Sequence, residues 1–92
     1  MIKSFSCSDT QDLFAGKTVA RFVNIRTVAE RKLQMLHRAA ILNDLMIPPN
    51  NRLEALKGDR QGQYSIRINA QWRICFRFED GNAFDVVIVD YH

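Results

Sequence analysis

Apolar side chains occupy every second position in two stretches of the second half of the chain. They are Tyr64, Ile66 and Ile68 in the first stretch and Trp72, Ile74, Phe76 and Phe78 in the second. Successive side chains of a strand point to opposite faces, so this period predicts two strands with one face toward a core. The apolar face of such a sheet must be covered, which predicts an α+β domain with its helices on that face.

Three further segments are expected to join this sheet. Ile2–Phe5 alternates apolar and polar residues, Arg52–Leu56 precedes a glycine-bounded turn over 57–62, and Phe84–Val89 follows a hairpin turn at 80–82. The last segment has no clean alternation, which favours a central strand covered on both faces. The sheet is therefore predicted to be mainly antiparallel, with about four to five strands.

The first half of the chain carries two helical patterns. N-cap residue types begin a short helix over 8–14, and Gly16 ends it. The main helix is expected to start at Asn24 or at Thr27, with Thr27 and Glu30 at the spacing of a capping box. Its core-facing stripe consists of Ile25, Val28, Ala29, Leu33, Leu36, Ala39 and Ala40.

Two polar residues of the main helix, Lys32 and His37, are expected to have structural rather than functional roles. Lys32 falls inside the apolar arc, where a buried stem with the ammonium group reaching solvent is the simplest arrangement. His37 lies on the polar side and is interpreted as a surface residue. Residues 42–46 either extend the helix or form a separate turn before Pro48 and Pro49, which cannot continue a helix.

Length and composition restrict the class of protein. A chain of 92 residues fits one domain spanning 1–92, and 47% hydrophobic with 25% charged residues is typical of a globular protein. No stretch approaches the roughly 18 apolar residues of a membrane span, and no signal peptide is apparent, so a cytoplasmic protein away from membranes is expected. Two cysteines and two histidines, Cys7, Cys75, His37 and His92, form no zinc pattern, so no metal or other cofactor is expected.

The charge distribution points weakly to an anionic partner. Thirteen Lys and Arg against ten Asp and Glu give a net charge of +3. The strand alternation places Arg67, Arg73 and Arg77 on the sheet face opposite the helices, where guanidinium groups can hold phosphates bidentately. The alternative is an ordinary solvated face, in which arginine keeps the strands soluble.

The last three residues, Asp90, Tyr91 and His92, bring acid–base chemistry near this face. They offer a carboxylate, an aromatic ring and an imidazole that can act near neutral pH. Beside arginines, such groups suffice for metal-independent RNA cleavage, in which the 2′-hydroxyl attacks the neighbouring phosphorus. A solvated tail is the alternative for a terminal segment.

Several motifs along the chain resemble one toxin family. They are Arg52-Leu53-Glu54-Ala55-Leu56-Lys57-Gly58-Asp59-Arg60, Tyr64-Ser65-Ile66-Arg67-Ile68, Trp72-Arg73-Ile74, the opening Met1-Ile2-Lys3-Ser4-Phe5 and the closing Asp90-Tyr91-His92. Together they are similar to the HigB/GraT-type toxins of the RelE/ParE toxin–antitoxin superfamily, and they cover nearly the whole chain. The resemblance implies a RelE-like fold, with N-terminal helices packed on a twisted antiparallel sheet. It also implies a cognate helix-turn-helix antitoxin of the HigA type and ribosome-dependent cleavage of mRNA, which inhibits translation and arrests growth.

The resemblance implies roles for individual residues. His92 matches a general acid or base, Asp90 a catalytic carboxylate or one that orients the imidazole, and Tyr91 an aromatic that positions a base. Arg73 matches the arginine at the scissile phosphate, and Glu54 stands where a HigB member has a histidine. Glu54 is therefore either a general base or a polar residue on a strand edge.

Other basic residues are assigned to RNA contacts. Lys57 matches a basic residue near the substrate backbone, and Arg60 and Arg67 are interpreted as phosphate or ribosomal RNA contacts. A further cluster in and before the main helix either holds ribosomal RNA phosphates or forms a solvated face. It consists of Lys17, Arg21, Arg26, Arg31 and Arg38.

Two classes of function follow from these features. The first is a type II toxin that acts as an endoribonuclease. The second is a growth inhibitor of the same fold with weak or no nuclease activity, acting on ribosome biogenesis or, like ParE toxins, on gyrase. The Asp90, Tyr91, His92 and Arg73 set favours the first class, because a pure binding module needs no acid–base pair.

Overall fold

One antiparallel sheet with the strand order β1-β2-β3-β4 organises residues 1–91, which are the residues that the computed structural model describes. Within that range the sheet has four strands. They are β1 (Glu54–Ala55), β2 (Tyr64–Arg67), β3 (Trp72–Glu79) and β4 (Asn82–Asp90). The predicted alternating strands are confirmed, although β1 is shorter than the Arg52–Leu56 segment expected for it.

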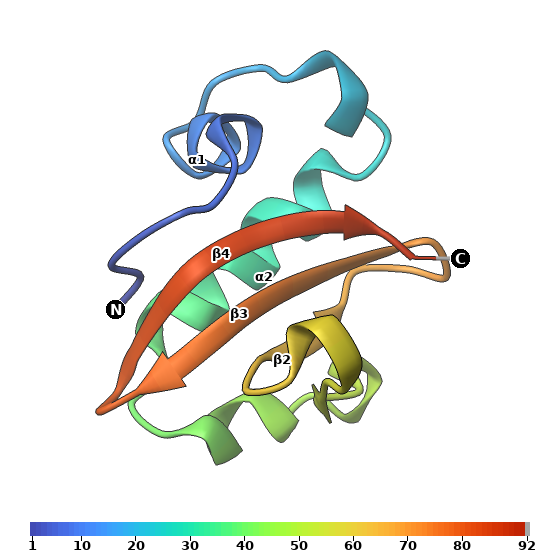
Figure 1. The fold of residues 1–92 in the computed structure, drawn as a ribbon. Coiled ribbons are helices and arrows are strands. Elements are labelled where there is room, and N and C mark those ends of the chain that lie inside the picture. Colours follow the sequence, from blue (N-terminus) through green and yellow to red (C-terminus); the bar gives the residue numbers. More distant parts are fainter. Residues whose placement is uncertain (92) are drawn as a thin grey trace.

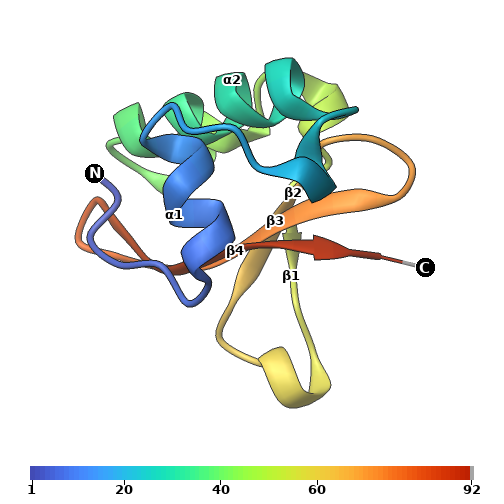
Figure 2. The same ribbon diagram turned by 90° about the horizontal axis from the view of Figure 1, so that it is seen from above.

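The helices cover one face of this sheet. The two α-helices are α1 (Ser8–Phe14) and α2 (Arg26–Arg38). Short 3-10 helices connect the elements, namely η1 (Ala20–Phe22), η2 (Leu42–Met46), η3 (Pro49–Asn51) and η4 (Gly58–Arg60). Both α-helices lie on the same side of the strongly twisted sheet, while the β1–β2 connection with η4 extends to the other side (Figures 1 and 2). The predicted α+β class is confirmed, and η2 is a separate turn rather than an extension of α2.

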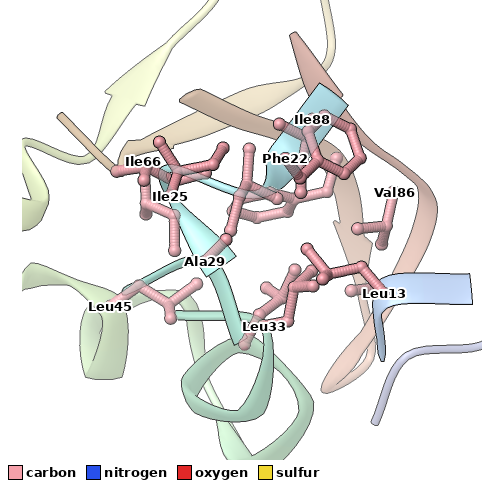
Figure 3. Close-up of a cluster of buried hydrophobic side chains, with 14 of the residues drawn as sticks. Leu13, Phe22, Ile25, Ala29, Leu33, Leu45, Ile66, Val86 and Ile88 are labelled. Carbon is pink, nitrogen blue, oxygen red and sulfur yellow. The ribbon is translucent and has the colours of Figure 1, made fainter. Parts of the chain in front are cut away.

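Buried aliphatic and aromatic side chains from helices and sheet form one core (Figure 3). Leu33 and Leu36 of α2 and Ile66, Ile74 and Phe76 of the sheet are almost fully buried. The helical and strand periods read from the sequence therefore identify most of the core correctly. Ala40 is the exception in the predicted stripe, because α2 ends at Arg38 and leaves Ala40 exposed.

Neither α-helix starts with the predicted side-chain cap. The N-cap of α1 is Cys7 and that of α2 is Ile25, and neither makes a side-chain cap hydrogen bond. Thr10 is buried instead, and its Oγ1 accepts a hydrogen bond from the backbone N–H of Ile88 at 3.0 Å. Glu30 pairs with Arg26 at 3.3 Å rather than reaching back to Thr27.

The prediction that the last strand lies centrally is wrong. β4 is the outer strand of the sheet order, and its broken alternation comes from a bulge opposite Cys75 to Arg77. Asp85 has a φ of 55° there. Because of this extra residue, the buried positions of β4 change from the odd-numbered Ala83 to the even-numbered Val86 and Ile88. The predicted Ile2–Phe5 strand is reduced to two isolated parallel bridges to β4.

Lys32 and His37 are both more buried than predicted. Lys32 is only 6% exposed, and its ammonium group donates to Oδ1 of Asn51 in the interior instead of reaching solvent. His37 is half-buried, accepts a hydrogen bond from the Ile2 N–H at Nδ1, and stacks at a tilt against Phe14. Both polar groups therefore join chain segments that are distant in sequence.

None of the helices in residues 1–91 is both long enough and apolar enough to span a membrane.

Candidate active site

A groove of about 260 Å³ opens on the arginine-lined side of the sheet, near the end of β4. Its lining residues come from the segment before β1, from β1, β2 and β3, from the β2–β3 connection and from the residue after β4. Its lining residues are Arg52, Glu54, Arg67, Asn69, Ala70, Arg73 and Tyr91. We call it the Arg73 groove. Four of the predicted site residues meet there, namely Glu54, Arg67, Arg73 and Tyr91.

Arg73 is fixed at the base of this groove. It is only 9% exposed, and its Nε donates to Oγ of the buried Ser65 at 2.9 Å. Its Nη2 donates to the carbonyl oxygen of Arg52 at 2.7 Å. A long side chain held by two hydrogen bonds loses little further freedom when it binds an anion, so Arg73 is pre-organised for a phosphate.

Glu54 and Tyr91 flank the Arg73 guanidinium. Oε1 of Glu54 lies 3.6 Å from Nη2 of Arg73, and the Arg73 guanidinium carbon lies 5.5 Å from the centre of the Tyr91 ring. The Glu54 side chain is 54% exposed, so it faces the open groove rather than the protein interior. A carboxylate, a cation and an aromatic ring thus surround one accessible space.

The sheet register explains why these residues meet. Glu54 is paired with Ser65, and Arg67 with Arg73, so all four side chains share the face opposite the core. Val89 pairs with Arg73 on β4, and two positions later the alternation brings Tyr91 to the same face. This is the face that the period of two predicted.

Arg52 and Asn69 line the groove but were not predicted as site residues. Arg52 has a φ of 47°, a left-handed conformation that an arginine in the sequence does not indicate. Oδ1 of Asn69 accepts from the N–H groups of Gln71 and Trp72 at 2.8 Å each and so closes the β2–β3 turn. An asparagine just before a turn is a usable signal for that role.

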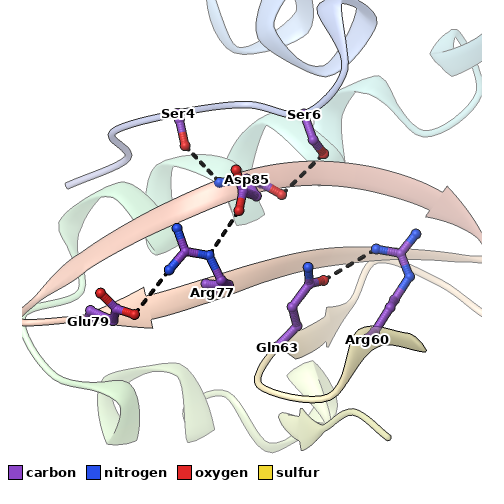
Figure 4. Close-up of polar contacts among 7 residues, drawn as sticks. All are labelled: Ser4, Ser6, Arg60, Gln63, Arg77, Glu79 and Asp85. Carbon is purple, nitrogen blue, oxygen red and sulfur yellow. Dashed lines mark hydrogen bonds and ion pairs between the residues drawn. The ribbon is translucent and has the colours of Figure 1, made fainter. Parts of the chain in front are cut away.

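Three predicted site residues lie outside the lining of the groove. Lys57 is exposed between β1 and η4, and Arg60 donates to Oε1 of Gln63 at 3.3 Å (Figure 4). Asp90 is paired with Trp72, so the strand alternation turns it toward the helix side, where Oδ2 accepts from Gln71 at 3.2 Å. His92 lies outside the described residues.

Arg77 shares the outer face but is engaged by carboxylates. Its Nε donates to Asp85 at 2.9 Å and its Nη1 donates to Glu79 at 3.0 Å. Asp85 is itself held by Ser4 and Ser6 of the N-terminal segment (Figure 4). Arg77 therefore supports the bulge in β4, whereas Arg73 faces a groove.

The buried Cys75 lies on the outer sheet side near Arg60 and Arg73. Burial raises the pKa of its thiol, and the positive charges of Arg60 and Arg73 act in the opposite direction. Arg60 and Arg73 therefore both place positive charge near the buried thiol.

The groove is suited to anions rather than to cations. Within residues 1–91, no group of three or more His, Cys, Asp or Glu side chains could hold a metal ion. The pre-organised Arg73, with Arg67 and Arg52 beside it, supplies positive charge for a phosphate, and Glu54 can accept a proton from a bound group.

The sequence matches one protein family over most of its length. The family model described as RelE-like toxin of type II toxin–antitoxin system HigB matches residues 13–92. Toxin HigB-1 of Vibrio cholerae is 42% identical over 65 residues, which is 71% of this chain and 68% of that protein. Endoribonuclease HigB of Proteus vulgaris is 38% identical over an alignment of 98 positions that covers 100% of both chains.

Solved structures show the same fold at lower identity. YafQ of Escherichia coli superposes with a TM-score of 0.70 at 13% identity, covering 98% of this chain and 91% of YafQ. YoeB in the YoeB–YefM complex of Staphylococcus aureus gives a TM-score of 0.63 at 22% identity, covering 100% and 95%. The matching family model and the two HigB relatives establish that the chain belongs to the HigB-like family, the RelE-like toxins of type II toxin–antitoxin systems.

Proposed function

We propose that this toxin is a metal-independent endoribonuclease that cleaves mRNA on the ribosome, with the Arg73 groove as its active site. The relative named Endoribonuclease HigB, aligned over the whole chain, supports the reaction class. The single observation that carries the proposal is Arg73, a nearly buried arginine held by Ser65 and Arg52 at the base of an open groove, beside Glu54 and Tyr91.

The proposed reaction is a transesterification within the RNA. A base removes the proton of a 2′-hydroxyl, the 2′-oxygen attacks the adjacent phosphorus, and the bond to the 5′-oxygen of the next nucleotide breaks. An acid protonates the departing 5′-oxygen, so the products are a 2′,3′-cyclic phosphate and a 5′-hydroxyl. Arg73 stabilises the negative charge that develops on the phosphoryl oxygens.

The remaining predicted residues are assigned by their position. Tyr91 offers a ring against which a base can stack, and Arg67 supplies a second cation in the groove. Lys57 and Arg60, outside the groove, are proposed to contact neighbouring phosphates. Asp90 and His92 stay candidates for acid–base work, and the Asp90 carboxylate accepts a hydrogen bond from Gln71, which lies outside the groove lining.

Glu54 is the described residue best placed to act as the base. Its carboxylate lies in the groove and close to Arg73, which would also contact the phosphate. A general base must come within hydrogen-bond reach of the proton that it abstracts, and an exposed glutamate side chain at this position can do so.

The proposed partners are an antitoxin, the ribosome and mRNA in the cytoplasm. Membership of a toxin–antitoxin family supports a cognate antitoxin, and the related fold of YoeB is seen in a complex with YefM. The helix-turn-helix type of that antitoxin follows from the resemblance to HigB toxins and is part of the proposal.

Mapping of 5′ ends on a defined mRNA in programmed ribosomes tests the proposed function. Wild type should produce new ends in the ribosomal A site, and both a des-His92 variant and Glu54→Ala should cut more than about tenfold slower if each residue takes part in proton transfer. An unchanged rate in either variant removes that residue from the mechanism. A wild-type toxin that arrests growth without cutting mRNA would reject the nuclease and leave ribosome biogenesis or gyrase as the target.

A further inference from the structure

A second groove, of about 350 Å³, adjoins the Arg73 groove. It lies between α2, the segment around Asn50 and the β2–β3 connection. Its lining residues are Val28, Arg31, Lys32, Asn50, Arg67, Ile68, Asn69 and Ala70. We call it the Lys32 groove. Three of these residues, Arg67, Asn69 and Ala70, also line the Arg73 groove, so the two grooves border the same β2–β3 connection.

The Lys32 groove is lined by three cations and by no acidic residue. Within residues 1–91, no carboxylate lies within ion-pair distance of Arg31, Lys32 or Arg67, although six other ion pairs occur there. This separates the groove from the Arg77 region, where two carboxylates neutralise the guanidinium.

Lys32 makes this groove more than a solvated basic surface. It is 6% exposed, and its one hydrogen-bond partner in residues 1–91 is the neutral Oδ1 of the fully buried Asn51. Burial and the positive charge of Arg31 lower the pKa of the Lys32 ammonium group. A buried cation without a counter-charge is unfavourable, and an anion in the groove would compensate for both effects.

We infer that the Lys32 groove is a second RNA-phosphate subsite beside the Arg73 groove. The inference rests on the proposed function for its choice of RNA as the anion. Arg67 lines both grooves, so its guanidinium group is available to a phosphate in either of them. The β2–β3 turn is fixed by Asn69 and lies beside the C-terminal end of β4 (Figures 1 and 2).

Two kinds of RNA carry the phosphate that these cations would bind. The phosphate belongs either to the substrate strand that enters the Arg73 groove or to ribosomal RNA next to it. Both require the same cations, so a binding assay with two arms distinguishes them.

Two variants change the Lys32 groove without altering its buried part. Arg31→Gln removes an exposed cation, and Asn50→Asp adds a negative charge at an exposed residue of nearly the same shape. Their matched controls are Lys3→Gln, which removes an exposed cation from the N-terminal segment, and Asn43→Asp in η2. Both control residues are exposed, and neither lines this groove.

Affinity is measured for a single-stranded oligonucleotide that 2′-O-methyl groups make uncleavable, and for ribosomes without mRNA. In at least one arm, Arg31→Gln and Asn50→Asp should each weaken binding by about tenfold at low salt, and each control by less than about twofold. Arg31→Gln should also make the salt dependence shallower by about 0.7 in log–log slope for a single strand. Loss in the oligonucleotide arm assigns the subsite to the substrate strand, and loss in the ribosome arm alone assigns it to ribosomal RNA.

Equal effects of the groove variants and their controls in both arms would overturn the subsite, as would the absence of any binding. The result is independent of cleavage, because the oligonucleotide cannot be cut. A toxin that fails to cleave mRNA but shows the expected binding differences would therefore reject the proposed nuclease and keep the subsite.

Discussion

Replacing Arg73 by alanine is expected to lower mRNA cleavage on programmed ribosomes by about a hundredfold or more. The reason is that Arg73 is the fixed cation at the base of the groove, where charge develops on the phosphoryl oxygens in the transition state. Arg73→Lys should lose nearly as much, because an ammonium group cannot keep the two hydrogen bonds of the guanidinium in one plane. The cleavage rate is measured from 5′-end mapping at saturating toxin.

Arg77→Ala is the matched control for this prediction. Arg77 belongs to the same strand and lies on the same face, but Asp85 and Glu79 neutralise it. Its removal should reduce the cleavage rate less than about threefold, with only a modest loss of stability, since exposed ion pairs contribute little. Equal losses in the two variants would show a general electrostatic effect of the basic face and contradict a specific site at Arg73.

Replacing Asn51 by alanine is expected to lower the free energy of unfolding by about 3–5 kcal/mol, most of the margin of a small domain. Asn51 is fully buried and accepts a hydrogen bond from the Lys32 ammonium group. Its Nδ2 donates to the Leu45 carbonyl and to Sδ of Met35, both at 3.1 Å. The variant would leave a buried cation and a buried carbonyl without a partner.

The neighbouring residue provides the control for Asn51. Asn50 is exposed, so Asn50→Ala should change the free energy of unfolding by less than about 0.5 kcal/mol. Urea unfolding followed by circular dichroism gives both values. Similar stabilities of the two variants would mean that Lys32 finds solvent or another partner when Asn51 is removed, and that the buried pair is not a structural requirement.

The sequence predicts the parts of the fold that follow from side-chain periods. The alternation from Tyr64 to Phe78 places Ile66 and Ile74 in the core and Arg67 and Arg73 on the other face, as the register confirms. The same period, extended along β4, also separates Tyr91 from Asp90, because adjacent residues of a strand point to opposite faces.

Other features depend on contacts between distant segments, which periods do not encode. Lys32 was predicted to reach solvent, since its helix position alone does not show that η3 folds Asn51 over it. The bulge at Asp85 is held by Ser4 and Ser6 from the opposite end of the chain, and it is what disturbs the alternation of β4.

The candidate site was predictable in its composition but only partly in its arrangement. Motif resemblance and strand period together identified Glu54, Arg67, Arg73 and Tyr91, which the structure brings into one groove. Neither motif resemblance nor strand period shows that Ser65 and the Arg52 carbonyl fix Arg73. The contact with Ser65 depends on the β2–β3 pairing, and the contact with the Arg52 carbonyl depends on the left-handed conformation of Arg52.

One measurement tests most directly whether this groove cleaves RNA through the 2′-hydroxyl. A defined mRNA carrying a single 2′-deoxynucleotide on the 5′ side of the mapped cleavage position is placed in the ribosome and treated with the wild-type toxin. Cleavage at that position is expected to be lost, while the unmodified mRNA gives an upstream fragment with a 2′,3′-cyclic phosphate and a downstream fragment with a 5′-hydroxyl. Cleavage of the deoxy-substituted mRNA at an unchanged rate would contradict attack by the 2′-hydroxyl.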